Sequence, residues 1–456
     1  MVAERYSLAL KKFQLIFTFG GEQMDKLNRL ENKSTLVYDA KVPGSKSFTN
    51  RALVLAAQRV GRTRITNALM CDDTRYLAQA LNSFKGLEVI QDNDCFIVER
   101  TYKTIEAPTE AVYMGGAGTP ARFMLAFAAS AEGETIVSGN PRLSQRPMKD
   151  ILDAFVAMGI QFECMEQEGC LPVKIIGGRP TSNLWEVSGE ISSQFLSSLL
   201  IHAAQQDQFE SVEVSVPGHL VSKPYVNMTL DMMNKVGIKI EETQPNRFIV
   251  QPSNPVAEEI VVEVDASGMS YPVTAAVLTQ TSVRIRGISR KSAQGDVALV
   301  DVYAKMGCDV REDEEGILIT GKPLSGIDVD MEFMPDVVLS LAVAASQASG
   351  PTKITNIANL RVKECDRIAA CANELIRLGF EVEEGSDWLV IHPKKSLTPA
   401  QVHTYDDHRV AMAFSLLGLL YEGVSVEDPA CVSKSFPEFW NEMQRFMDFH
   451  RAAVSA

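Results

Sequence analysis

One pattern recurs five times along this chain of 456 residues. A helix-like stretch ends at a glycine, and alternating apolar and polar residues follow at once. Glycine ends a helix because it adopts a left-handed backbone at little cost. The alternation has the two-residue period of a half-buried strand. The glycines lie roughly 70 to 80 residues apart, longer than most solenoid repeats. They are Gly86, Gly159, Gly237, Gly307 and Gly379.

This repeat predicts an α/β protein built from an array of similar helix-plus-sheet units. Each unit buries one helical face, so the units must cluster to form cores. The chain is long enough for two or more domains, and no low-complexity linker separates them. The alternative is that α/β proteins often use glycine caps, which leaves the number of units open.

Charge and cysteine content restrict the partners. The net charge of −14 argues against nucleic acid or an anionic membrane, because both select basic surfaces. An anionic ligand therefore needs a local cluster of cations. No segment has the uninterrupted apolar length of a membrane span. The eight cysteines show neither Cys-x-x-Cys pairs nor zinc spacing, which is typical of reduced thiols in a cytoplasmic protein without a structural metal.

Residues 1–34 are interpreted as an N-terminal extension. They mix basic and apolar residues without a clear cleavage site, so a weak targeting segment is one interpretation. In the other, Gly20-Gly21-Glu22 is encoded by a purine-rich tract that resembles a ribosome-binding site. We then expect natural translation to begin at Met24, and N-terminal mass spectrometry of the native protein would test this.

The stretch from Pro43 to Ser47 predicts an anion-binding helix start. Its sequence, Pro-Gly-Ser-Lys-Ser, leads through Asn50 and Arg51 into an apolar run. The NH groups and partial positive charge of a helix start stabilise a phosphate or carboxylate. Lys46 adds a point charge, and Arg51 adds a planar fork for two oxygens. A serine cap beside two surface cations has the same sequence, so this motif alone leaves both interpretations open.

Three further polar segments interrupt the apolar pattern of the first half of the chain. The turn Gly115–Thr119, before Pro120 and Arg122, predicts a bare backbone that a ligand can approach; an ordinary glycine-rich loop is the alternative. Ser192-Ser193-Gln194 precedes an apolar run and predicts hydroxyl donors at a helix start. For Ser222-Lys223 and Tyr225, a solvated loop is expected from the residues alone.

The C-terminal half concentrates charge. On a helix, Lys363 and Arg367 would lie at i and i+4, with Glu364 at i+3 spacing from Arg367; a solvated charged face is the alternative favoured by such a run. Asp407-His408-Arg409 adjoins apolar sequence, where charges are costly unless they are paired or used. Asp336 also lies between apolar residues, and an N-cap would explain it equally well.

Taken together, these residues resemble the motif series of the 5-enolpyruvylshikimate-3-phosphate synthase family, the 3-phosphoshikimate 1-carboxyvinyltransferases. The motifs appear in family order and cover nearly all of the chain after about Lys41. They are Pro43-Gly44-Ser45-Lys46-Ser47 with Asn50-Arg51, Ala117-Gly118-Thr119 with Arg122, Arg146-Pro147, Ser192-Ser193-Gln194-Phe195, Ser222-Lys223-Pro224-Tyr225, Asp265-Ala266-Ser267, Leu360-Arg361-Val362-Lys363-Glu364 with Asp366-Arg367, Asp407-His408-Arg409, and Lys434 with Phe436-Pro437.

The resemblance implies two globular domains, each of three repeated helix-plus-sheet subdomains, with the active site in the cleft between them. Residues 45–264 would form the first domain, and residues 35–44 with 265–456 the second. Five of the six implied subdomains coincide with the glycine repeat. A cytoplasmic monomer without metal or organic cofactor is expected.

The implied reaction transfers the enolpyruvyl group of phosphoenolpyruvate to the 5-hydroxyl of shikimate 3-phosphate. The related transferase acting on UDP-N-acetylglucosamine would be expected to show Lys-Asn in the first motif and a catalytic cysteine, whereas Ser47 follows Lys46 here. Another phosphorylated alcohol as acceptor stays open. A non-catalytic binding or scaffolding protein of this fold is disfavoured, because it would have little reason to keep so many like charges together.

The resemblance also assigns residues. Catalysis falls to Lys46, Asp336 and Glu364. Shikimate 3-phosphate would be bound by Lys46, Ser47, Arg51, Ser192, Ser193, Gln194, Ser222, Tyr225, Asp336, Asn359 and Lys363. Phosphoenolpyruvate would be bound by Lys46, Gly118, Arg146, Gln194, Arg367, Arg409 and Lys434. Two phosphates and two carboxylates would meet there, and clustered Lys and Arg offset their repulsion.

The glycine-rich turn departs from the family pattern. Gly116 stands where the family usually has Asn, Pro120-Ala121 replaces a more usual Ala-Met pair, and Phe123 replaces a common Pro. Since Gly118 is retained, the resemblance implies sensitivity to the inhibitor glyphosate, which an inhibition curve for the purified protein would test.

Overall fold

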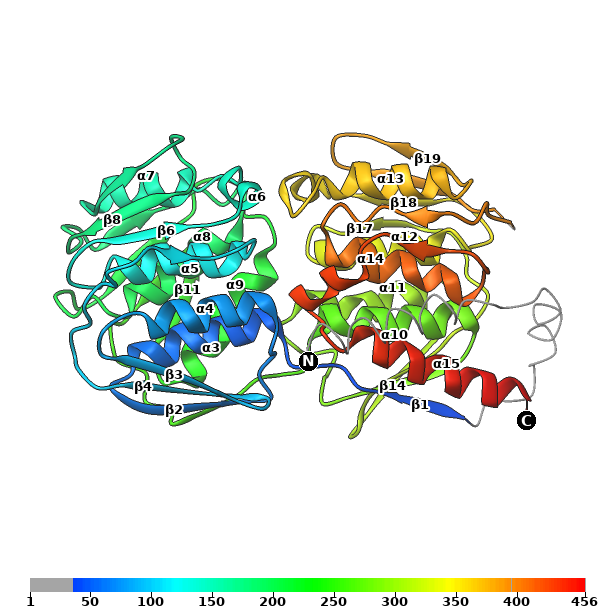
Figure 1. The fold of residues 1–456 in the computed structure, drawn as a ribbon, viewed down its shortest axis with the longest axis horizontal. Helices are drawn as coiled ribbons and strands as arrows, with labels where there is room; N and C mark the ends of the chain where they lie inside the picture. Colours follow the sequence, from blue (N-terminus) through cyan, green and yellow to red (C-terminus); the bar gives the residue numbers. More distant parts are fainter. Residues whose placement is uncertain (1–35, 395, 456) are drawn as a thin grey trace. The chain divides into compact units, whose positions relative to one another are not determined.

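The computed structural model describes residues 36–394 and 396–455, and these form two compact units (Figure 1). The first unit spans Gly44–Glu263; the second takes the described residues up to Pro43 and from Val264 onward. These bounds differ by one residue from those expected. Residues 1–34 lie outside the described residues, so a start at Met24 stays a prediction.

Five four-stranded sheets of the described chain share one topology, three in the first unit and two in the second. In each, a parallel pair is extended by an antiparallel hairpin. In one of them β5 (Val112–Tyr113) pairs in parallel with β6 (Thr135–Ser138), which is antiparallel to β8 (Val173–Gly177); β7 (Gln161–Cys164) forms the edge. The predicted array of similar units is therefore confirmed.

The other four sheets repeat this order. In the first unit they are β13 (Glu259–Val261), β2 (Gly61–Thr66), β4 (Cys95–Arg100) and β3 (Leu87–Asp92), and β9 (Leu184–Glu186), β10 (Val212–Ser215), β12 (Arg247–Val250) and β11 (Ile240–Gln244). In the second unit they are β1 (Val37–Ala40), β14 (Ser282–Arg286), β16 (Gly316–Thr320) and β15 (Asp309–Asp313), and β17 (Asp328–Asp330), β18 (Thr352–Thr355), β20 (Leu389–His392) and β19 (Glu381–Glu384).

The five predicted glycines each stand just before the edge strand of one hairpin. All five have left-handed backbones, with φ between 81° and 119°, which explains why glycine is used there. In the sixth repeat only the parallel pair β21 (Gln401–Val402) and β22 (Ser425–Val426) is present among the described residues, followed by η6 (Pro429–Lys434) and α15 (Phe439–Ser455). The glycine pattern found five repeats because it marks the hairpin.

Each repeat contains a buried helix that leads into the second strand of its parallel pair. In four repeats this helix also follows the first strand directly. In the two repeats of α3 and α10, the chain reaches the helix after crossing from the other unit. In the first unit these helices are α3 (Lys46–Gln58), α5 (Gly118–Ala128) and α8 (Ser193–Ala203), and in the second α10 (Ala266–Thr279), α12 (Val338–Ala345) and α14 (His408–Ser415). Every residue of α10, α12 and α14 is buried. Such burial on all sides places α10, α12 and α14 in the core of the second unit.

A second helix precedes each hairpin and is more exposed. These helices are α4 (Asp72–Asn82), α7 (Lys149–Met158) and α9 (Lys223–Lys235) in the first unit, and α11 (Leu299–Lys305) and α13 (Arg367–Arg377) in the second. Short turns of helix precede three of them: α6 (Pro141–Ser144) before α7, η2 (Gly295–Ala298) before α11 and η4 (Ala358–Val362) before α13. In addition, η3 (Pro335–Val337) leads into the core helix α12, and η5 (Leu416–Leu419) follows α14.

The chain crosses between the units twice. Strand β1 pairs with β14 of the second unit (Figure 1), whereas β13 supplies the equivalent strand to the first unit by pairing with β2. Beside the crossings, Ser45 N donates to Glu263 O at 2.8 Å and Asp265 N donates to Pro43 O at 2.9 Å. Helices α3 and α10 therefore begin directly after a crossing.

Candidate functional site

The polar residues predicted to be functional gather at equivalent points of the repeats. Each core helix begins just after a strand, and its first turn offers NH groups and a partial positive charge. The predicted helix starts after Ser45, Ala117 and Ser192 are confirmed. Residues at or beside the six starts are Lys46, Gly118, Ser193, Ser267, Asp336 and Arg409.

In the first unit, Lys46 is ion-paired with Asp73. The Lys46 Nζ lies 3.0 Å from the Asp73 carboxylate, and the two side chains are 14% and 4% exposed. Asp73 belongs to the first turn of α4, where the helix dipole favours a negative charge. No role of Asp73 is predicted from the sequence. Its one sequence signal is an acidic pair at a helix start, which is an ordinary capping feature.

The guanidinium of Arg51 is buried among neutral acceptors and is 1% exposed. Its Nε donates to Thr229 Oγ1 at 2.8 Å, and its Nη2 to the Tyr225 carbonyl at 2.7 Å and Ser197 Oγ at 3.3 Å. Its Nη1 donates to the Ser47 carbonyl at 3.0 Å. Burial lowers the pKa of Arg51 to about 10, so it stays positive at neutral pH. Direct binding of substrate by Arg51 stays a prediction.

Phe123, which departs from the family pattern, packs against the guanidinium of Arg51. The Arg51 Cζ lies 5.5 Å from the centre of the Phe123 ring, within the range of a cation–π contact. Phe123 itself is 1% exposed. This departure therefore packs inside the unit, against a cation.

Arg122 sets the orientation of Gln194. Its Nη1 donates to Gln194 Oε1 at 2.5 Å and its Nη2 to the Pro147 carbonyl at 3.5 Å. Its guanidinium also lies 4.8 Å from the centre of the Phe195 ring. Because the amide oxygen of Gln194 accepts from Arg122, its NH2 group points the other way and presents donors, as an anionic ligand requires.

The first turn of α5 lies against Arg146. A Cβ atom on Gly118 would come within 2.7 Å of the Arg146 Cζ, so the guanidinium occupies the space that any larger residue would need. Arg146 is 6% exposed. The bare backbone expected at Gly118 is therefore approached closely by Arg146, a cation of the same unit.

The serine breaks begin helices. Ser192 caps α8 by accepting a hydrogen bond from Gln194 N at 3.3 Å. The solvated loop expected around Ser222 is wrong: Ser222 is 5% exposed and α9 begins at Lys223. Pro224, in the first turn of α9, has the backbone angle of a helix start, which explains the difference.

In the second unit, Arg367 binds three carboxylates and is 2% exposed. Its Nε lies 2.7 Å from Asp407 Oδ2, its Nη1 3.0 Å from Asp336 Oδ1, and its Nη2 2.8 Å from Glu364 Oε2. Burial disfavours the charged guanidinium, but Asp407, Glu364 and Asp336 outweigh it and raise the pKa of Arg367. The three carboxylates are thus held around one cation.

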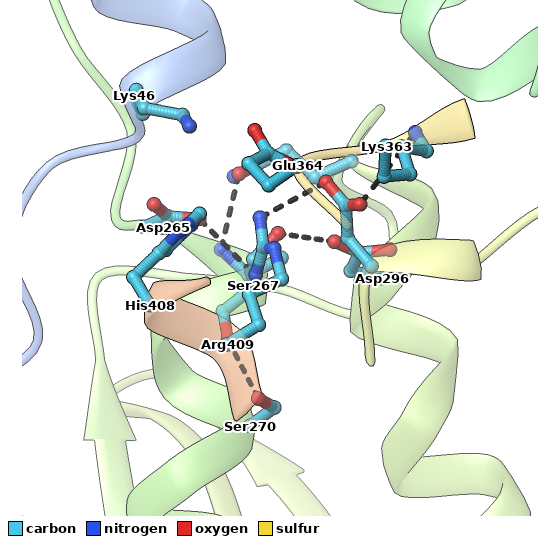
Figure 2. Close-up of polar contacts among 12 residues, drawn as sticks. Lys46, Asp265, Ser267, Ser270, Asp296, Lys363, Glu364, His408 and Arg409 are labelled. Atoms are coloured by element: carbon cyan, nitrogen blue, oxygen red, sulfur yellow. Dashed lines mark hydrogen bonds and ion pairs between the residues drawn. The ribbon is translucent and has the colours of Figure 1, made fainter. Parts of the chain in front are cut away.

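Three further cations complete this network, whose members Lys363, Glu364 and Arg409 are seen in Figure 2. Arg409 Nη2 lies 2.9 Å and Lys363 Nζ 3.7 Å from the Asp336 carboxylate, and Lys434 Nζ lies 3.4 Å from Glu364 Oε1. We call these residues the charged network. Its members are Asp336, Lys363, Glu364, Arg367, Asp407, Arg409 and Lys434.

The expected helix over Lys363 to Arg367 is wrong, and so is a solvated charged face. Helix α13 begins at Arg367 because Asp366 caps it, accepting from Ala369 N at 3.0 Å. Lys363 and Glu364 lie before the helix, after η4. The i, i+3 pair of Glu364 with Arg367 nevertheless forms, because the chain turns toward the network there. Asn359, assigned from the resemblance, lies half-buried in η4.

Asp336 is held ionised. Burial alone would raise the pKa of Asp336, but Arg409, Lys363 and Arg367 together lower it well below its ordinary value. The carboxylate is therefore ionised at neutral pH and can accept hydrogen bonds. The N-cap alternative is wrong, since Val337 occupies the N-cap of α12.

Two further carboxyl groups complete the site. Asp407 caps α14 by accepting from Arg409 N at 2.9 Å, and it also binds Arg367, so the charges of the Asp407-His408-Arg409 motif are paired, as its apolar surroundings require. Asp296 in η2 accepts a hydrogen bond from Ser267 Oγ (Figure 2). Asp296 is not predicted from the sequence, because no neighbouring charge marks it.

Among residues 36–394 and 396–455, no group of three or more His, Cys, Asp and Glu side chains is placed to hold a metal ion. In the same part of the chain, no helix has both the length and the apolar character needed to cross a bilayer.

Comparisons with known proteins match most of the chain to one family. The family model described as "EPSP synthase (3-phosphoshikimate 1-carboxyvinyltransferase)" matches residues 30–443. Proteins named 3-phosphoshikimate 1-carboxyvinyltransferase are similar over 88% of this chain and 95% of their own length, at 40% identity in Colwellia psychrerythraea and 39% in Aliivibrio salmonicida.

Solved structures show the same fold. EPSP synthase from Acinetobacter baumannii superposes with a TM-score of 0.75 at 24% identity, covering 89% of this chain and 95% of that one. The enolpyruvyl transferase NikO from Streptomyces tendae superposes with a TM-score of 0.71 at 18% identity, covering 91% and 95%.

Proposed function

The chain belongs to the EPSP synthase family, and we propose that both units contribute anion-binding residues, whereas the carboxylates that transfer protons come from the second unit. The reaction transfers the enolpyruvyl group of phosphoenolpyruvate to the 5-hydroxyl of shikimate 3-phosphate and releases phosphate, a step of the shikimate pathway to aromatic amino acids. Both substrates are anions, which suits cations at helix starts.

Shikimate 3-phosphate is bound mainly by hydroxyl, amide and cationic groups of the first unit. Arg51 keeps its positive charge among neutral partners, and the start of α8 supplies hydroxyls and backbone NH groups. These features support the assignment of Lys46, Ser47, Arg51, Ser192, Ser193, Gln194, Ser222 and Tyr225 from the first unit, and of Asp336, Asn359 and Lys363 from the second.

Phosphoenolpyruvate is bound by cations of both units. In the first unit, the packing of Arg146 against Gly118 and the outward NH2 group of Gln194 support this assignment. In the second, Arg409 and Lys434 lie at the ends of the charged network. The assigned residues are Lys46, Gly118, Arg146, Gln194, Arg367, Arg409 and Lys434.

Asp336 and Glu364 transfer the protons. The 5-hydroxyl adds to the enol ether carbon while the methylene carbon gains a proton; the intermediate then loses that proton and phosphate. The observation that carries the assignment is the single guanidinium of Arg367, which holds both carboxylates at 3.0 and 2.8 Å. Asp336 accepts the hydroxyl proton, Glu364 serves the methylene carbon, and Lys46 stabilises the leaving phosphate.

The first experiment measures phosphate release from the purified protein. Phosphoenolpyruvate is supplied with either shikimate 3-phosphate or UDP-N-acetylglucosamine as acceptor. Release only with shikimate 3-phosphate is expected. Release with neither would redirect the search to another phosphorylated alcohol, because the fold and the reaction type admit one.

The assignment requires residues of both units to contact the same substrates. Binding in a cleft between domains 45–264 and 35–44 with 265–456 stays a prediction. Solution scattering with and without shikimate 3-phosphate tests it, since a ligand that contacts both domains stabilises a more compact state. Equal compactness in both conditions would count against it.

We further propose a cytoplasmic monomer. All eight cysteines, which lie within the described residues, are free thiols, which suits a reducing compartment. Light scattering during size-exclusion chromatography tests the monomer, and fractionation of the source cells tests the location.

A further inference from the structure

The backbone of Ser222 has a left-handed conformation that residues other than glycine rarely adopt. Its φ is 54° and its ψ is 40°, where the Cβ atom crowds the backbone. A serine at the start of a helix normally has an extended backbone and caps the helix with its hydroxyl. Ser222 precedes α9 but makes no side-chain cap bond, and it is 5% exposed. Such conformations persist only where surrounding contacts hold them, and they are concentrated at binding sites.

A hairpin turn of the same unit holds the segment that leads to Ser222. The turn joins β11 to β12, and Asn246 lies in it with a φ of 60°. Val216 N donates to the Asn246 carbonyl at 2.9 Å, and Asn246 Nδ2 donates to the Gly218 carbonyl at 3.3 Å. The residues before Ser222 are therefore tied to this turn.

Glu242 ties the residue after Ser222 to the same turn. Its Oε1 accepts from Lys223 Nζ at 2.8 Å and from Asn246 N at 2.8 Å. The side chains of Lys223 and Glu242 are 32% and 24% exposed, so water and salt screen this ion pair less than a fully exposed one. One carboxylate oxygen thus connects the start of α9 with the turn, and Ser222 is held from both sides.

We propose that Glu242 is a positioning residue for shikimate 3-phosphate. Through its ion pair with Lys223, it holds Ser222 in the left-handed conformation in which the serine binds this substrate. The inference rests on the assignment of Ser222 to shikimate 3-phosphate made above. Without the ion pair, Ser222 also adopts relaxed conformations, and the affinity falls with the fraction of molecules that remains competent to bind.

The ion pair could also act on the substrate in the opposite direction. Lys223 directly follows Ser222, and a lysine can bind a phosphate. Glu242 would then compete with the substrate for Lys223, and loss of its carboxylate would improve binding. The backbone of Ser222 favours the positioning role, because competition for Lys223 leaves its strained conformation unexplained.

The test compares the KM for shikimate 3-phosphate in the wild-type protein and in Glu242→Gln. The glutamine keeps an oxygen to accept from Asn246 N but carries no charge for Lys223. We expect this KM to rise about fivefold, whereas kcat and the KM for phosphoenolpyruvate change by less than about twofold. A lower KM for shikimate 3-phosphate, or a fall in kcat with this KM unchanged, would overturn the inference.

The matched control is Asp231→Asn. It removes a 2.7 Å ion pair with Lys235 at the other end of α9, so it tests the general effect of losing an ion pair from this helix. All three kinetic values should stay at those of the wild type. A rise in the KM for shikimate 3-phosphate equal to that of Glu242→Gln would show that the position of the pair does not matter, and the inference would fail.

A double variant distinguishes the positioning of Ser222 from an effect elsewhere. Ser222→Ala lacks the hydroxyl that Glu242 is proposed to position. In this background, Glu242→Gln should raise the KM for shikimate 3-phosphate by less than about twofold. A full, independent rise would show that Glu242 acts elsewhere and would contradict the proposal. Lys223→Met removes the same ion pair and replaces Glu242→Gln in this comparison if that variant does not fold.

Ser222→Ala alone separates this inference from the assignment on which it rests. If the KM for shikimate 3-phosphate is unchanged in Ser222→Ala, the assignment of Ser222 fails. If Ser222→Ala raises this KM while Glu242→Gln has no effect, the role of Glu242 alone fails.

Discussion

Arg51 in the first unit and Arg367 in the second are almost equally buried, at 1% and 2% exposure, yet their surroundings are opposite. Arg51 donates to hydroxyl and carbonyl oxygens, and burial lowers its pKa to about 10. Arg367 binds three carboxylates, which raise its pKa. The difference teaches that a buried guanidinium with neutral partners offers a net charge to an anion, whereas one with carboxylate partners fixes those carboxylates in place.

The largest effect is expected when Arg367 is removed from its three carboxylates. Arg367→Met leaves Asp336, Glu364 and Asp407 without their shared cation, and removal of one partner from a buried ion pair costs about 3–5 kcal/mol. We expect a loss of this size in the free energy of unfolding, measured by urea denaturation, together with loss of phosphate release. The matched variant Arg51→Met leaves only neutral acceptors, so it should lose less stability. Equal losses in both would contradict the comparison.

The next effect concerns turnover. Asp336→Asn keeps the shape of the side chain but removes its charge and most of its capacity to accept a proton. We expect kcat to fall about 10²- to 10⁴-fold, with a much smaller change in KM, as measured by steady-state phosphate release. Glu364→Gln should behave alike. Asp328→Asn, at an exposed position of β17, is the control; near-normal turnover in both site variants would remove these carboxylates from the mechanism.

A pH effect on stability is expected from His202 of the first unit. His202 in α8 is buried beside Ser130 Oγ at 3.0 Å and Gln206 Nε2 at 3.2 Å, and burial lowers its pKa from 6.5 to about 4. Between these values the unfolded chain binds a proton that the folded chain does not, so stability falls as the pH falls. From pH 7 to pH 5 we expect His202 to contribute a loss of about 2 kcal/mol.

Urea denaturation at both pH values measures this loss. The pKa of Asp336 is held far lower, so the second unit should not lose stability from that group in the same interval. Asp296, whose raised pKa acts in the opposite direction, and His450, whose pKa burial also lowers, are present in both proteins, so the loss due to His202 is the difference between the wild type and His202→Gln. A pH dependence that persists unchanged in this variant would exclude His202 as its source.

The smallest effect concerns the Lys46 pair. Asp73→Asn removes the charge that lies 3.0 Å from Lys46 Nζ but leaves an amide of the same size. The lysine then keeps its charge and loses its position, so kcat/KM should fall about tenfold for both substrates. The control is Asp72→Asn, one residue earlier in α4, because Asp72 is partly exposed and pairs with Arg75 instead of Lys46. An equal fall in the two variants would show that the helix start, and not the pair, matters.

Local patterns predicted a large part of the fold. The five glycines before the edge strands were found because a left-handed backbone at a helix end selects glycine by itself. The helix starts at Lys46, Gly118 and Ser193 were found for the same kind of reason, since capping depends on neighbours in the chain. The sixth repeat was missed because it has no hairpin among the described residues and so no glycine to mark it.

Contacts between distant residues could not be predicted in this way. Asp73 and Asp296 carry no sequence signal beyond that of ordinary helix starts, and their meaning comes from Lys46 and Ser267. The helix expected over Lys363 to Arg367 failed because the spacing of charges on a helix says nothing of Asp336 and Asp407, which draw this segment into a buried network.

The sequence by itself determined the α/β repeat, the helix starts and, through its motif series, the family. These depend on backbone preferences and on residues close together in the chain. The tertiary structure alone decided which carboxylates share Arg367 and which guanidinium is buried among neutral acceptors. The physical reason is that charge energies in a protein depend on burial and on the distance to other charges, and both are set by residues far apart in the sequence.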